Sequence, residues 1–230
     1  MKKTILFWII AIVGTLVFAF YQRVTGPTYA LSGSTNFNGK EIKYKLERSH
    51  SSSSNYHLEI KTGDASIRGV LTYKKFNTEN EFTEVTMNGT EILTAELPAQ
   101  ARLEKLDYYI KLFKDDSSVQ IPSGKAVTIR FKDDVPIWLL IPHILGMFLA
   151  MMLSNRTGLE FFNKEPKLDK LALWTIIVLF IGGFPLGFAM NGFAFGEMWG
   201  GWPFGNDVTD NKTQVAFIAW LIEFYFIKKK

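Results

Sequence analysis

The chain of 230 residues contains no cysteine, so its fold cannot depend on disulfide bonds. The same absence excludes cysteine-ligated zinc and iron–sulfur clusters, because thiolates supply the ligands in both. Histidine is scarce as well, with three residues in the whole chain. A domain of about 110 residues can nevertheless fold without disulfides, because it buries a sufficient hydrophobic core.

A basic patch that would bind nucleic acid is also missing, although the net charge is +4 and the isoelectric point is about 9.1. Between residues 24 and 134 the basic and acidic residues nearly cancel. Outside this segment the basic residues flank long apolar runs, where lipid headgroups and membrane topology explain them. We therefore expect the lipid bilayer, and not nucleic acid, to be a partner of this chain.

Four apolar runs predict four transmembrane helices, over residues 1–23, 135–153, 171–191 and 213–227. The second and third runs reach the roughly 20 residues needed to cross the hydrocarbon of a bilayer. The first run is either an uncleaved signal anchor, which we favour, or a signal peptide. The fourth run is shorter, so it spans the membrane only if its polar flanks lie in the headgroups. The alternative for the fourth run is an interfacial helix.

The distribution of positive charge predicts the orientation of these helices. With the N-terminus in the cytoplasm, nine lysines and arginines lie at the cytoplasmic ends of the helices and in the loop at residues 154–170. The outer loop at residues 192–212 contains Lys212 alone. This asymmetry agrees with the positive-inside rule. We therefore predict a multi-pass protein of a bacterial inner (plasma) membrane, with both termini cytoplasmic and residues 24–134 in the periplasm.

Residues 24–134 alternate between apolar and polar side chains, which is typical of half-buried β-strands. Eight or so short strands in about 100 residues favour a two-layer antiparallel sandwich. The predicted fold is an α+β membrane protein, with an antiparallel β-sandwich inserted after the first of four transmembrane helices. The predicted domains are residues 1–23, 24–134 and 135–230. The strands are expected near residues 42–46, 56–60, 71–73, 85–87, 93–97, 106–112, 119–121 and 127–131.

One part of this segment resembles the E–F corner of immunoglobulin-like and fibronectin-type modules. Leu97 and Pro98 precede a loop, and the strand that follows carries Tyr108 and Tyr109. In those modules a corner tyrosine donates a hydrogen bond to the backbone. The resemblance therefore implies an immunoglobulin-like sandwich in which Tyr108 or Tyr109 has a structural role.

His50 and His57 flank a run of four serines at residues 51–54. Nucleophilic catalysis would also need an orienting acid and an oxyanion hole, and no motif supplies either. A flexible turn between strands is the favoured interpretation, and a metal-binding pair of histidines is the alternative. We therefore predict a binding or spacer module and lean against an enzyme.

His143 lies inside the second predicted span, directly after Pro142. A titratable side chain in hydrocarbon is costly, which makes His143 a candidate for function. Met147 and Met151 follow at helical spacing, so haem or copper ligation is one interpretation. Helix packing or proton handling is the favoured one, because a haem in the membrane usually needs two histidines.

The third predicted span carries Gly183 and Gly187 at the spacing that lets two helices approach closely. Pro185 lies between them and permits a kink. We expect these residues to pack against the second span, facing His143.

The loop after the third span is rich in glycine, oxygen ligands and tryptophan. Trp199 and Trp202 are expected in the aromatic belt at the outer face of the membrane. Carboxylate and amide oxygens suit a divalent cation, but Lys212 stands where an EF-hand loop requires glycine. The alternative is that the polar residues cap the fourth helix and shape a turn. The candidate polar or cation site comprises His143, Glu197, Asn206, Asp207, Asp210 and Asn211.

These features favour a membrane accessory or assembly protein that presents its β-sandwich to an extracytoplasmic or membrane protein partner. The alternative is a transporter or redox-complex subunit that uses His143 with Glu197, Asp207 and Asp210 at the outer face. No cofactor is strongly implied, although a divalent cation is possible in the second case.

Overall fold

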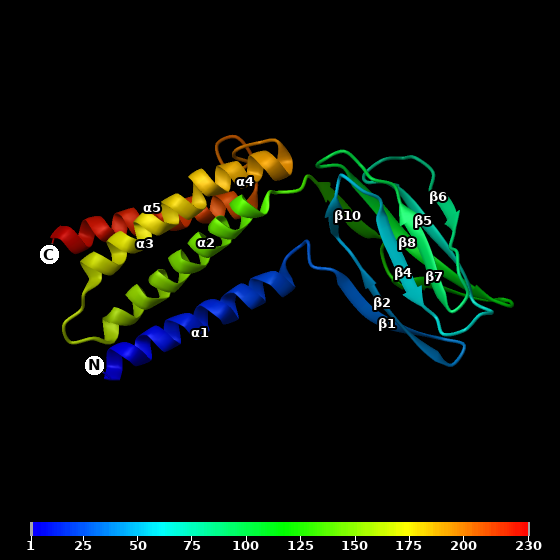
Figure 1. Ribbon diagram of the computed structural model, residues 1–230, viewed down its shortest axis with the longest axis horizontal. Coiled ribbons are helices and arrows are strands. Elements are labelled where there is room, and N and C mark those ends of the chain that lie inside the picture. Colours follow the sequence, from blue (N-terminus) through cyan, green and yellow to red (C-terminus); the bar gives the residue numbers. More distant parts are fainter. Residues whose placement is uncertain (1, 230) are drawn as a thin grey trace. The chain divides into compact units, whose positions relative to one another are not determined.

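The computed structural model describes residues 2–229, which form two compact units (Figure 1). One unit contains the helices and is built from the chain up to residue 24 and from residue 135 onward. The other unit is Thr25–Asp134 and contains all the strands of the described chain. The protein is therefore an α+β chain with a β-rich insertion.

The helical unit holds three segments long and apolar enough to cross a membrane, counted over residues 2–229: Lys3–Thr25, Ile137–Phe162 and Leu168–Phe195. A multi-pass membrane protein in contact with lipid is thereby supported. The helix at Val208–Lys229 is not among the three, so a fourth span stays a prediction. The helices are α1 (Lys2–Thr25), α2 (Ile137–Gly158), the 3-10 helix η1 (Leu159–Phe162), α3 (Leu168–Gly183), α4 (Pro185–Phe195) and α5 (Val208–Lys229).

Two helix boundaries differ from the sequence prediction. The second apolar helix continues through α2 and η1 to Phe162, well beyond residue 153. The third is interrupted at Phe184, because Pro185 has no N–H to continue the ladder and instead starts α4. With α4 ending at Phe195 and α5 beginning at Val208, the outer loop shrinks to residues 196–207.

The β-rich unit contains three sheets. The largest has the order β3–β10–β8–β5–β6, and β9 pairs with the half of β8 that β10 leaves free. β1 pairs with β2, and β4 pairs with β7. The strands are β1 (Leu31–Phe37), β2 (Lys40–Leu46), β3 (Ser49–Ser51), β4 (Tyr56–Lys61), β5 (Arg68–Lys75), β6 (Thr83–Thr86), β7 (Ile92–Leu97), β8 (Lys105–Lys114), β9 (Ser117–Ile121) and β10 (Val127–Lys132).

All strand pairs are antiparallel except β3 with β10, which are parallel. The predicted β-rich region is confirmed, whereas its assignment as an immunoglobulin-like sandwich stays a prediction. The sequence analysis missed β1 and β3. β1 buries only Phe37 fully, and β3 is three residues long in the serine run, so neither shows an apolar alternation.

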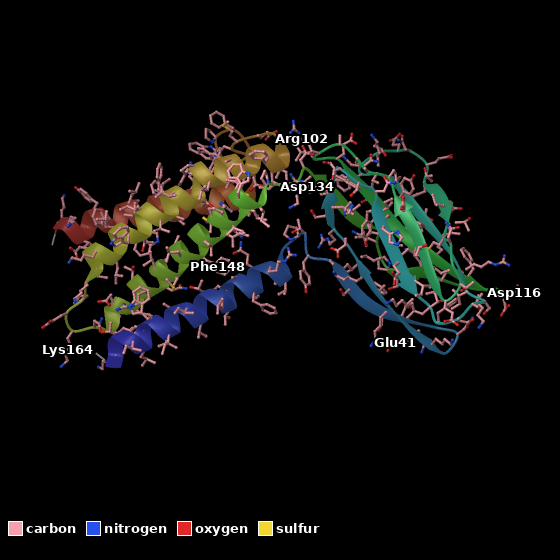
Figure 2. The ribbon with its side chains drawn as sticks, in the orientation of Figure 1. Glu41, Arg102, Asp116, Asp134, Phe148 and Lys164 are labelled. Carbon is pink, nitrogen blue, oxygen red and sulfur yellow. The ribbon has the colours of Figure 1, made fainter. Side chains whose placement is uncertain are left out.

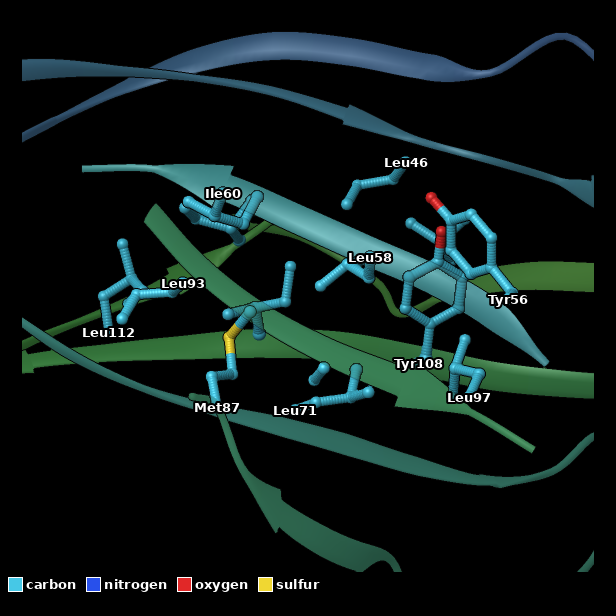
Figure 3. Packing of buried hydrophobic residues seen from close by; sticks show 14 of the residues in the cluster. Leu46, Tyr56, Leu58, Ile60, Leu71, Met87, Leu93, Leu97, Tyr108 and Leu112 are labelled. Carbon is cyan, nitrogen blue, oxygen red and sulfur yellow. The ribbon is translucent and has the colours of Figure 1, made fainter. Parts of the chain in front are cut away.

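The core of the β-rich unit lies between these sheets, as the close view of Leu58, Leu71, Leu93 and Tyr108 shows (Figure 3). Alternate residues of each central strand are buried, and β8 has the most regular alternation. The strand pleat therefore directs one side of β8 into the core and leaves the other side outside.

Tyr108 is the largest fully buried side chain of this core. Its hydroxyl donates a hydrogen bond of 2.8 Å to the carbonyl oxygen of Glu47, and the N–H of Glu47 donates to the hydroxyl of Tyr56. Burial raises the pKa of Tyr108, so the phenol keeps its proton and acts as a donor. Tyr108 therefore makes a structural hydrogen bond, while Tyr109 lies on the opposite side of the sheet. The acceptor for Tyr108 is 61 residues earlier in the chain, whereas the corner tyrosine of immunoglobulin-like modules bonds the backbone a few residues upstream.

We predict that Tyr108→Phe lowers the free energy of unfolding of the β-rich unit by about 1–3 kcal/mol, because the buried carbonyl of Glu47 loses its donor. Native-state hydrogen exchange of β4 and β8 in the full-length protein measures this loss. The matched control is Tyr109→Phe, which should change stability by less than about 0.5 kcal/mol. Equal losses in the two variants would show that the buried hydrogen bond is not the cause.

Candidate functional site

Glycines shape the loop between α4 and α5. Gly196 adopts a left-handed conformation with φ of 78° and ends α4, where its N–H donates to the carbonyl of Gly192. A Cβ atom on Gly201 would lie 2.9 Å from the side chains of Asp210 and Asn211. The chain therefore needs glycine at these positions for a tight turn and close packing, and not for a ligand.

The polar side chains of the loop point back into it and satisfy its backbone. Asp207 accepts hydrogen bonds from the N–H groups of Thr209 and Asp210, at 2.8 and 3.1 Å, and so caps the start of α5. Asp210 accepts from the N–H of Gly200 at 2.8 Å and from the amide of Asn191 on α4.

Asn211 completes this network by accepting the N–H of Trp202 at 2.7 Å. Three of the candidate oxygen ligands are therefore already occupied by the chain's own donors.

The remaining candidates face outward. Glu197 and Asn206 are exposed, and their side chains make no hydrogen bond or ion pair within residues 2–229. Trp202 is 67% exposed, whereas the ring of Trp199 stacks on Phe184 with centroids 5.8 Å apart. Trp199 is thus a packing residue, and Trp202 is free to contact lipid headgroups.

His143 is separate from the loop network. Its Nδ1–H donates to the carbonyl oxygen of Gly182 at 3.0 Å, because a carbonyl can only accept. Pro185 breaks the helix a turn later, so His143 supports the backbone of α3 close to its end. Within the described chain, no hydrogen bond or ion pair joins this imidazole to the loop carboxylates.

The glycines of α3 and of the start of α4 pack against two neighbouring helices, α2 and α5. The closest approach to α2 is at Gly182, where an added Cβ would lie 3.1 Å from the backbone of Gly146. Gly187 lies near His143, with 3.9 Å between its ideal Cβ position and the imidazole. Gly183 instead faces α5, against the methyl group of Thr213. Packing on the second span is therefore centred one residue before the predicted glycine.

Over residues 2–229 there is no group of three or more histidine, aspartate or glutamate side chains close enough to hold an ion. Of the residues predicted from the sequence, Glu197, Asn206, Asp207, Asp210 and Asn211 lie in the loop or at the start of α5, whereas His143 lies on α2.

The sequence analysis missed a buried ion pair at the other end of α2. The Nη2 of Arg156 lies 2.5 Å from Oε1 of Glu160, and the two side chains are 4% and 2% exposed. Glu160 also accepts from the amide of Asn163 at 2.8 Å and from the N–H of Lys167 at 2.9 Å. These hydrogen bonds fix the turn that connects η1 to α3.

Arg156 also joins α1 to α2. Its guanidinium lies 5.6 Å from the ring centroid of Phe7 and 5.4 Å from that of Trp8. The amide of the neighbouring Asn155 donates to the hydroxyl of Thr15 at 3.0 Å. Cation–π and hydrogen-bond contacts therefore hold the first helix against the second.

The serine run has an ordered structural role in the β-rich unit. Ser51 and Ser53 donate to Oδ2 of Asp134, at 2.8 and 3.1 Å, and Ser52 donates to Asp133. Figure 2 labels Asp134 and Arg102 at one end of this unit, where Arg102 pairs with Asp133 at 3.4 Å. We call this network the serine clasp.

The two histidines beside the serine clasp do not form a catalytic arrangement with it. His50 packs its ring on Tyr56 and Phe131. His57 lies 4.0 Å from Glu96 across the β4–β7 pair. Nε2 of His50 lies 3.4 Å from Oγ of Ser54 and 3.2 Å from the carbonyl oxygen of Asn55. Within residues 2–229 no carboxylate hydrogen-bonds the His50 ring, so the serine–histidine–acid order of a catalytic triad is not formed.

The side of the six-stranded sheet that faces away from the core carries exposed aromatic rings. We call it the outer sheet face. Phe113 of β8 is 38% exposed, and Phe76 and Phe82 beside β5 and β6 are 45% and 40% exposed. The strand residues of this face are Ser49, Ser51, Arg68, Val70, Thr72, Lys74, Glu84, Thr86, Lys105, Asp107, Tyr109, Lys111, Phe113, Ser118, Gln120, Thr128, Arg130 and Lys132.

No model of a known protein family matches the chain, and no curated protein matches it significantly.

We predict that Asp210→Ala destabilises the helical unit by about 1–3 kcal/mol, because Gly200 and Asn191 lose their buried acceptor. Thermal unfolding followed by tryptophan fluorescence measures this, since all the tryptophans lie outside residues 25–134. Glu197→Ala is the control and should change stability by less than about 0.5 kcal/mol. If Asp210→Ala leaves the stability unchanged or raises it, Asp210 is not a stabilising acceptor. The loop carboxylates would then repel one another, as in a binding site for a cation.

We also predict that Arg156→Met lowers stability by about 3–5 kcal/mol, because it leaves the buried Glu160 without its cation. The double variant Arg156→Met with Glu160→Gln should recover much of this loss. Lys164→Met removes an exposed charge nearby and serves as the control in the same unfolding assay. If the double variant is as unstable as the single one, the pairing of the two charges is not what stabilises this end of α2.

Proposed function

We propose that this chain is a membrane-anchored accessory or assembly protein whose β-rich unit binds a partner outside the cytoplasm. The observation that carries the proposal is the outer sheet face, where large aromatic side chains are exposed on a well-packed sheet. Exposed apolar side chains grouped on one face are typical of protein interaction sites.

The helical unit anchors the protein with four spans in this proposal. α5 runs alongside α3, as Figure 1 shows within the helical unit. Asp210 of α5 accepts a hydrogen bond from Asn191 of α4, the helix that continues from α3, and Lys228 of α5 lies 3.9 Å from Asp169 of α3 at the other end. A helix that accompanies α3 over its whole length crosses the same thickness of bilayer.

The orientation follows from charge. Nine basic residues lie on the side of the predicted membrane that carries both termini, against Lys212 alone in the outer loop. The β-rich unit is then outside the cytoplasm, in the periplasm of a bacterial inner membrane. A chain without cysteine suits that compartment, since it forms no disulfides there that could mispair.

An immunoglobulin-like sandwich is our proposal for the β-rich unit. It is supported by strands of all three sheets that contribute to one core. Such modules commonly serve as binding domains, which agrees with the outer sheet face as the contact surface.

The alternative, a transporter or redox-complex subunit, has less support. Asp207 and Asp210 are occupied as acceptors of backbone N–H groups, and His143 is tied to Gly182. A divalent metal or a haem absorption band in the purified protein would favour this alternative.

Site-specific photo-crosslinking tests the proposed function. We expect a benzoylphenylalanine at position 113 of the full-length protein, illuminated in intact cells, to form a discrete adduct with one other protein. The same reagent at position 59 of β4, away from the outer sheet face, should form no such adduct. The proposal is wrong if neither position captures a protein, or if both capture the same set.

A further inference from the structure

The outer sheet face is basic, although the β-rich unit as a whole is close to neutral. Six of its strand residues are basic and two, Glu84 and Asp107, are acidic. Asp107 in addition accepts a hydrogen bond of 2.5 Å from the hydroxyl of Thr128. The alternation of the strands has therefore sorted positive charge onto this face. The basic residues are Arg68, Lys74, Lys105, Lys111, Arg130 and Lys132.

The lysines of this face have no acidic partner within the described chain. None of the ion pairs in Thr25–Asp134 involves Lys74, Lys105 or Lys111. The cations that form those pairs belong to other surfaces or edges of the unit. They are Lys40, Lys45, His57, Lys61, Lys75, Arg102 and Lys114.

Aromatic rings hold these lysines in place. Lys74 lies 4.9 Å from the ring centroid of Phe82, and Lys111 lies 5.6 Å from that of Tyr109. Phe82 packs edge-on against Tyr109, with centroids 5.4 Å apart. The rings and lysine side chains cover the sheet closely. Thr72, which the register places on this face, is fully buried. The face is therefore a ridge of rings with ammonium groups fixed upon it.

We propose that the outer sheet face binds an acidic segment of another protein in which carboxylates alternate with apolar side chains. The proposal rests on the proposed function and names the chemistry of its partner. Carboxylates complement lysines that lack a counter-charge, and apolar side chains cover the exposed rings.

A protein partner fits this face better than an anionic polysaccharide does. Phe76, Phe82 and Phe113 expose ring surface that offers no hydrogen bond. Sugars require polar groups that bind hydroxyls, whereas leucine-like side chains bury such rings favourably. An extended segment also matches the face, because its side chains alternate with the same period of two as the strands.

Binding of a defined peptide to the full-length protein tests the inference. The protein is placed in nanodiscs of phosphatidylcholine, which carries no net charge, and a fluorescent peptide of alternating glutamate and leucine is titrated by anisotropy. We expect binding that is at least about tenfold tighter than that of the same peptide with glutamine in place of glutamate. Replacing the leucines by serine should also weaken binding, because the rings lose their apolar partner.

Charge reversals locate the binding surface. Lys105→Glu with Lys111→Glu should weaken binding of the acidic peptide by about tenfold or more. Lys43→Glu with Lys61→Glu makes the same change of charge on β2 and β4, away from this face, and should change binding by less than about twofold. Matching melting temperatures of the two double variants show that the difference does not come from unfolding.

Three outcomes would overturn the inference: no binding of the acidic peptide, equal binding of the glutamine peptide, or equal weakening by the two charge reversals. Binding of dextran sulfate through Lys105 and Lys111 without binding of the peptide would overturn it as well, and would indicate a polysaccharide. Crosslinking at position 113 separates these failures from failure of the proposed function. An adduct there with no peptide binding retains a protein partner and rejects only its acidic chemistry.

Discussion

Polar groups removed from water are stabilised by partners within the chain, and such hydrogen bonds hold the backbone of both units. In hydrocarbon no water is available to replace a missing donor or acceptor. His143 therefore supports the carbonyl of Gly182 near the break before Pro185. Tyr108 does the same for Glu47 inside the β-rich core. Both side chains thus hold the backbone in place.

The same constraint changes the interpretation of the outer loop. A dense set of oxygen atoms suggests a cation site only while their hydrogen bonds are unknown. Asp210 alone satisfies the N–H of Gly200 and the amide of Asn191. The glycines allow the turn, and the carboxylates accept hydrogen bonds from its backbone N–H groups. The structure of the loop therefore accounts for most of its unusual composition. The sheet then becomes the part of the molecule with unused surface chemistry.

The regular spacing of apolar residues in the sequence predicted those strands and helices that bury a regularly spaced set of side chains. β8 alternates over ten residues, and its position follows from the sequence. β1 could not be recognised, because serine, glycine and threonine occupy the places where apolar residues would signal a strand. The extension of α2 was missed for a similar reason. Arg156 and Glu160 were taken for loop residues since charges normally end an apolar run, yet they neutralise each other inside the bundle.

The candidate site depends on contacts that spacing along the chain does not encode. Asn191 and Asp210 are nineteen positions apart and meet only because the loop after α4 brings the start of α5 back to Asn191. The basic character of the outer sheet face was hidden by counting charge over the whole segment. Near neutrality of a domain says nothing about how the pleat divides its charges between two faces.

The serine clasp gives the β-rich unit two unequal connections to the rest of the chain. At its start the chain enters through β1, which pairs with β2 alone. At its end β10 is paired on both sides, by β3 and β8, and the two aspartates after it are tied to the serines and Arg102. A force applied to the outer sheet face would therefore pass through β10 to Asp134. It would reach α2 across only two intervening residues, Val135 and Pro136. The link between β10 and α2 is therefore the shorter and more firmly paired of the two connections.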